Sequence, residues 1–189
     1  MKLDAKKICT LAVSVSLAMI LSFVESQIPP LSAVPGIKLG LSNIVGVFLL
    51  YTLGIPSAIA VTLIRVLLSA LLFGNTVSLV YSLSGAALSL LVMAVAKQLN
   101  LFSIGGVSIL GAIFHNVGQV AAAMIIMENA AIAVYLAPLL VSGTVAGLAV
   151  GILAALIAKR LAPHLKPQTE NKSAKAKEKN SVETTHGQE

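Results

Sequence analysis

Two charged residues inside apolar stretches are the side chains of this sequence most able to do chemistry. Arg65 lies near the middle of one such stretch, and Glu25 is the only carboxylate available to pair with it inside the apolar region. A cation at the centre of a bilayer costs about 2.5–3.5 kcal/mol and usually faces a bundle interior or a water-filled cavity. The helical rise places Glu25 about 12 Å nearer the membrane surface than Arg65, so pairing requires Arg65 to reach far along its helix. Two interpretations stay open: Arg65 pairs with Glu25, or Arg65 binds an anionic ligand.

A second polar group falls in a later apolar stretch. His115 and Gln119 are one helical turn apart, and Asn116 shares nearly the same face as Gln119, so three polar side chains are expected to point one way. They either form hydrogen bonds between helices or line a ligand site. No second His or Cys stands at ligand spacing from His115, so the sequence predicts no metal site.

A third group precedes another apolar stretch. Lys38 and Asn43 are flanked by Gly36 and Gly40, which allow backbone to approach a ligand closely. The amide groups at a helix start favour anions. Alternatively, Lys38 is a loop residue at the level of the lipid headgroups. Taken with Arg65 and the histidine, this group favours a small, anionic substrate over a cationic one.

The composition indicates what must position these groups. The 189 residues are 57% hydrophobic and 11% charged, with a mean hydropathy of +0.96, whereas soluble domains are about 25% charged. Most charges crowd the two ends of the chain, which excludes a soluble enzyme. The sequence shows no cofactor motif and no basic surface interleaved with aromatic residues, so neither a cofactor nor a nucleic acid partner is expected.

Proline, glycine and asparagine residues divide the apolar region into six segments. At about 20 residues per span, the pattern predicts an all-α integral membrane protein with a bundle of about six transmembrane helices. The second segment is short, and the sixth is long enough to tilt or to bend at Pro138. The expected segments lie at about residues 8–27, 39–53, 55–73, 77–96, 104–127 and 130–158.

The distribution of basic residues predicts the orientation. Six spans place Lys2, Lys6, Lys7, Lys97, Lys159 and Arg160 on one side of the membrane and leave Lys38 on the other. The positive-inside rule then puts both termini in the cytoplasm. Residues 1–160 are expected to form the bundle, and residues 161–189 a disordered, charged cytoplasmic tail. Lysines in that tail either stay solvated or attract membrane lipid headgroups.

Small residues recur at helical spacing in several segments. Gly143, Gly147 and Gly151 form one stripe, and such stripes permit close packing between helices. Most stripes are expected to lie between helices of this chain. The stripe of Ala12 and Ser16, near the basic end of the first segment, is instead the best candidate for docking a partner.

Several motifs resemble those of one bacterial membrane family. They are Glu25-Ser-Gln-Ile-Pro-Pro, Pro35-Gly-Ile-Lys-Leu-Gly-Leu-Ser-Asn43, Arg65-Val-Leu-Leu-Ser-Ala-Leu-Leu-Phe-Gly74 and Gly111-Ala-Ile-Phe-His-Asn-Val-Gly-Gln119. The family is labelled "heptaprenyl diphosphate synthase component I" or "Gx transporter". It is similar to the substrate-binding S components of energy-coupling factor (ECF) importers. The resemblance covers about residues 5–160.

The resemblance implies six helices in the bacterial cytoplasmic membrane and an outward-facing pocket for a small-molecule substrate. It also implies that the first helix docks a transmembrane coupling subunit driven by ATPase subunits. The alternative is an accessory subunit of isoprenoid and quinone-tail synthesis. Catalysis is not expected in either case, because prenyl diphosphate synthases hold Mg²⁺ through aspartate-rich motifs, and Asp4 is the only aspartate of this chain.

Overall fold

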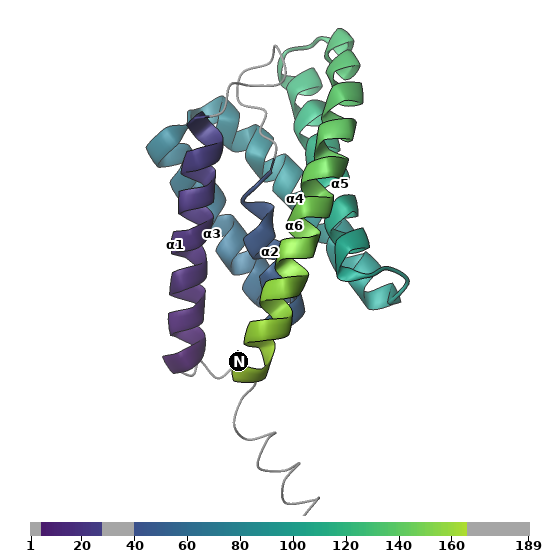
Figure 1. The fold of residues 1–189 in the computed structure, drawn as a ribbon. Coiled ribbons are helices and arrows are strands. Elements are labelled where there is room, and N and C mark those ends of the chain that lie inside the picture. Colours follow the sequence, from purple (N-terminus) through teal and green to yellow (C-terminus); the bar gives the residue numbers. More distant parts are fainter. Residues whose placement is uncertain (1–4, 28–39, 166–189) are drawn as a thin grey trace, which may run out of the picture.

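The described part of the chain is a bundle of helices. The computed structural model describes residues 5–27 and 40–165, and no strand occurs within those ranges. Five of the helical segments are long and apolar enough to cross a membrane, which agrees with the predicted all-α integral membrane fold. The elements, shown in Figure 1, are α1 (Ala5–Gln27), α2 (Asn43–Thr52), α3 (Ile55–Phe73), α4 (Thr76–Leu99), α5 (Ile104–Ile126), the 3-10 helix η1 (Ala130–Tyr135) and α6 (Leu136–Leu165).

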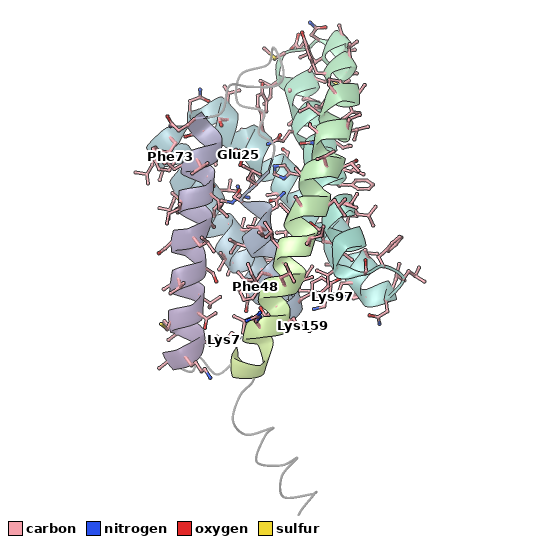
Figure 2. The ribbon with its side chains drawn as sticks, in the orientation of Figure 1. Lys7, Glu25, Phe48, Phe73, Lys97 and Lys159 are labelled. Atoms are coloured by element: carbon pink, nitrogen blue, oxygen red, sulfur yellow. The ribbon has the colours of Figure 1, made fainter. Side chains whose placement is uncertain are left out.

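The basic residues gather at one end of this bundle. α1 begins and α6 ends at the same end (Figure 1). Lys7, Lys97 and Lys159 all lie there, far from Glu25 and Phe73 (Figure 2). We call this the basic end. At the opposite end, the rings of Phe23 and Phe73 stack with their centroids 5.2 Å apart, so α1 and α3 finish at a common level. The assignment of the basic end to the cytoplasm stays a prediction.

The second predicted span is a helix, but a short one. α2 has 10 residues, which give a length of about 15 Å, half of a hydrocarbon core of about 30 Å. It reaches the basic end, where Lys97 donates a hydrogen bond to the carbonyl of Leu50 and lies over the ring of Tyr51 at 5.2 Å. Its first turn therefore lies inside the bundle. The expected start near residue 39 was too early because apolar composition does not mark where a helix begins.

Glycines bring α4, α5 and α6 into close contact, as predicted for the small-residue stripes. A Cβ atom on Gly147 of α6 would come within 2.9 Å of the Ala112 Cβ on α5. A Cβ atom on Gly85 of α4 would come within 2.7 Å of the His115 carbonyl. These backbones approach as closely as they do because both positions lack a side chain. The apolar core on either side includes Leu49 and Leu50 of α2, which are fully buried.

The sixth predicted segment is divided in two. The 3-10 helix η1 precedes α6, and Pro138 falls in the first turn of α6, where its missing amide hydrogen costs no helical bond. α6 continues to Leu165, five residues past the expected domain boundary at residue 160. Residues 166–189, the rest of the expected tail, lie outside the described residues.

Candidate functional site

The candidate site lies where the chain enters α2, and its centre is Glu25. The carboxylate of this α1 residue accepts hydrogen bonds from the backbone amides of Gly40 and Leu41, the second at 3.4 Å. Glu25 is only 5% exposed. These amides belong to the turn just before α2, so the carboxylate lies close to the positive end of the helix dipole. The anion expected at this helix start is therefore supplied by the chain itself.

Gly40 makes this arrangement possible. Its φ of +83° lies in the left-handed region, which side chains other than glycine rarely adopt. The carbonyl of Gly40 also accepts the amide of Asn43 at 2.9 Å, which starts the first turn of α2. A Cβ atom at Gly40 would come within 2.9 Å of the Asn43 side-chain nitrogen and 3.4 Å of the His115 ring. Gly40 thus brings Asn43 and His115 to the same point.

Arg65 of α3 is buried in the bundle, where the charge of Glu25 acts on it. It is 5% exposed, and the Glu25 carboxylate favours its positive charge. Arg65 lies eight residues before Phe73, about 12 Å below the level where α1 and α3 finish. The Glu25 charge offsets part of the cost of burying the guanidinium.

The three polar residues of α5 do not share one direction. Asn116 faces α6, where its side-chain nitrogen donates to the Leu139 carbonyl at 2.7 Å. His115 and Gln119 instead pack against Gly85 of α4. All three are at most 2% exposed. The expectation that they point one way is corrected, because α5 is packed between α4 and α6 and buries polar side chains on two faces.

A small cavity adjoins the start of α2. Its volume is about 10 Å³, and Gly40, Asn43 and Ser108 line it together with residues of α4 and α6. The side-chain nitrogen of Asn43 and the hydroxyl of Ser108 are buried and have no hydrogen-bond partner among residues 5–27 and 40–165. This volume holds about one water molecule, and both polar atoms suit one. A larger ligand requires the neighbouring side chains or helices to move apart.

Of the remaining predicted site residues, two lie on the surface of α1, and one lies outside the described residues. Ala12 and Ser16 of α1 are exposed, and the Ser16 hydroxyl donates to the Ala12 carbonyl at 3.1 Å. That small-residue face is therefore accessible and has its hydroxyl satisfied. Lys38 lies outside the described residues. Within residues 5–27 and 40–165, no three His, Cys, Asp or Glu side chains gather at a point that suits a metal ion.

Sequence reasoning missed the roles of Glu25 and Gly40. It treated Glu25 only as a possible partner for Arg65, and Gly40 only as a flanking residue. The available signal was the lone embedded carboxylate, combined with a glycine close before a short apolar segment. What the sequence could not indicate is that the chain returns into the bundle and brings its amides to that carboxylate.

Comparison with known proteins identifies a family. The model of a family described as "Heptaprenyl diphosphate synthase component I" matches residues 14–157. The match includes Glu25, Arg65 and the polar residues of α5. No curated protein and no solved structure matches.

Proposed function

This chain belongs to the heptaprenyl diphosphate synthase component I family, and from that membership we propose that it is a non-catalytic membrane subunit that binds a ligand and works with partner proteins. Two candidate roles follow. Each is supported by a different observation.

The first candidate is the substrate-binding S component of an ECF-type importer in the bacterial cytoplasmic membrane. The observation that carries it is the buried polar site at the start of α2. Arg65 and Glu25 are both buried in the bundle. Asn43 has a buried N–H group with no hydrogen-bond partner among the described residues. Buried charges and a helix that begins inside the membrane are typical of substrate sites in transport proteins. A small molecule with an anionic group suits Arg65 and Asn43, because Glu25 already fills the amide positions.

The exposed face of α1 supports the same role. Ala12 and Ser16 offer a small-residue surface toward the basic end, where another transmembrane helix can approach closely. In an ECF-type importer, a transmembrane coupling subunit would dock there and would transmit energy from ATPase subunits. The chain itself then contributes recognition of the substrate.

The second candidate is an accessory subunit of heptaprenyl diphosphate synthesis. The family description favours it, because it names a component of that synthase. In this role a soluble prenyl synthase supplies the catalysis, and the membrane subunit holds the enzyme or its product at the bilayer. The partner is then a synthase subunit rather than a coupling subunit.

Affinity purification with mass spectrometry distinguishes the two roles. Recovery of a coupling subunit with ATPases supports the importer, and recovery of a prenyl synthase supports the accessory role. Ala12→Leu should abolish recovery of a coupling subunit, because a large side chain prevents close helix approach. Ala60→Leu is the matched control, since Ala60 is an exposed alanine on α3. Equal recovery of a coupling subunit with both variants would show that the subunit does not dock on this face of α1.

Ligand identity is tested on the same purified protein. Native mass spectrometry of the wild-type chain should detect a bound small molecule that Arg65→Gln loses. A retained molecule would show that Arg65 serves only the fold.

A further inference from the structure

An apolar groove lies between α1 and α6, across one face of α2. α1 and α6 stand on either side of α2 in Figure 1. The groove is separate from the polar site around Glu25, with which it shares no lining residue. Its walls include Cys9, Val13 and Leu17 of α1, Ile44 and Phe48 of α2, and Ile157 of α6.

The groove is open to the membrane and has the size of a single chain. Val13 is 63% exposed and Leu17 is 45% exposed, so the α1 wall faces lipid. The volume is about 490 Å³. A segment of one unbranched or methyl-branched chain fits this space.

Positive charge surrounds the end of the groove. Lys6 lines it directly. Figure 2 shows Lys7 of α1 and Lys159 of α6 at the foot of the gap between these helices, below Phe48. Arg160 follows Lys159 on α6 and is exposed.

No carboxylate balances these charges within the part of the chain that the structure describes. Glu25 lies toward the opposite end (Figure 2). Glu128 follows α5, which runs from the basic end to the opposite end. The lysines at the mouth of the groove attract an anion.

We propose that this groove binds an isoprenoid diphosphate, with the polyprenyl chain along α1 and α2 and the diphosphate between Lys6 and Lys159. The proposal rests on the second candidate function. A long apolar chain with a compact, highly charged head matches both the groove and its basic mouth. The family description names such a molecule, heptaprenyl diphosphate, as a product.

Cys9 offers a direct measurement of occupancy. It is the single cysteine of the sequence, it is an exposed free thiol and it lines the groove. The full chain in phosphatidylcholine nanodiscs is treated with N-ethylmaleimide, and the rate of Cys9 alkylation is followed by mass spectrometry. Saturating heptaprenyl diphosphate should slow alkylation by about tenfold, as expected for a site that is about nine-tenths occupied. An unchanged rate overturns the proposal.

A matched pair of variants separates groove binding from general membrane effects. Val13→Phe places a ring in the groove and should abolish the protection of Cys9. Val24→Phe makes the same change on the same helix, at a lipid-exposed position that is not part of the groove. Val24→Phe should retain full protection. Equal protection in the two variants contradicts the assignment of the site.

The basic mouth is tested through the head group. The double change Lys6→Gln with Lys159→Gln should raise the concentration of heptaprenyl diphosphate that half-protects Cys9 by at least about tenfold. Each lysine near an anion at the membrane surface contributes about fivefold to affinity. Protection by uncharged heptaprenol should be weak in the wild-type chain and unchanged by these substitutions. Phosphatidylglycerol added to the nanodiscs should not protect Cys9. Full protection by phosphatidylglycerol would make the groove a general site for anionic lipid and overturn the prenyl assignment.

Failure of the groove proposal and failure of the accessory role give different results. If a prenyl synthase co-purifies but Cys9 is not protected, the accessory role stands and the groove proposal fails. If Cys9 is protected but no synthase co-purifies, the groove binds its ligand and the accessory role fails.

Discussion

At the residue scale, the charges inside this bundle form a balanced local arrangement. Glu25 accepts two backbone amides at the entrance to α2 and also acts on Arg65. One carboxylate therefore stabilises both a helix start and a buried cation. The ion-pair interpretation of Arg65 thus has structural support, whereas its role toward a ligand stays a proposal.

The Glu25 and Arg65 pair gives the first prediction. Glu25→Gln and Arg65→Gln should each lower the free energy of unfolding by about 3–5 kcal/mol, because each leaves one buried charge uncompensated. The double variant should lose less than the sum of the two, since neither charge remains. Thermal and denaturant unfolding in detergent measures this. Additive losses would show that the two side chains act independently.

Gly40 gives the second prediction. Gly40→Ala forces an alanine into the left-handed region and pushes its Cβ atom against the Asn43 side chain. Gly54→Ala is the control, because Gly54 has a similar φ of +86° but only a 3.9 Å contact with Pro56. The backbone strain of about 1–2 kcal/mol should appear in both. Only Gly40→Ala should lose more than this in an unfolding measurement, and equal losses would show that the space beside Asn43 is not tight.

At the element scale, the long helices could be predicted from the sequence and the short one only in part. Apolar length located α1 and α3 to within a few residues, because each must satisfy its own backbone in lipid. The start of α2 was not predictable, since the turn just before it, at Gly40 and Leu41, is held by Glu25 of another helix. The directions of His115 and Asn116 were also missed. They depend on which helices flank α5, and periodicity within one helix does not contain that information.

The contact between α5 and α6 gives the third prediction. Gly147→Ala should lower the free energy of unfolding by about 1–3 kcal/mol, because its Cβ atom would overlap Ala112 on α5. Gly105→Ala is a matched control on α5, where the nearest contact of the new Cβ atom would be 3.7 Å. That change should be neutral or stabilising, since alanine is the better helix former. Comparable losses in the two variants would mean that α5 and α6 can separate to accept a methyl group.

At the scale of the whole molecule, the described residues give the bundle one basic end, and Glu25 and Glu128 lie toward the other. This asymmetry indicates its orientation in the membrane. The sequence predicted that Lys7, Lys97 and Lys159 lie at one end, and they do (Figure 2). Lys38, which was expected on the other side of the membrane, lies outside the described residues.

Cysteine labelling in intact cells tests this orientation. With Cys9 replaced by serine, Lys159→Cys should react with a membrane-impermeant maleimide only after the cells are permeabilised. Glu128→Cys, at an exposed position of the opposite end, should react in intact cells. Reaction at Lys159→Cys in intact cells would invert the topology.

The short length of α2 also has a consequence for biogenesis. α1 and α3 both run from the basic end to the opposite end, so the chain must return between them, and α2 is the described helix that makes this return. Ten residues are too few for the insertion machinery to recognise as a span. The orientation of α3 then cannot result from full-length spans that insert one after another in alternating directions. It requires α2 to enter the bilayer together with α3, after α1 has placed Glu25 where the amides of Gly40 and Leu41 will meet it.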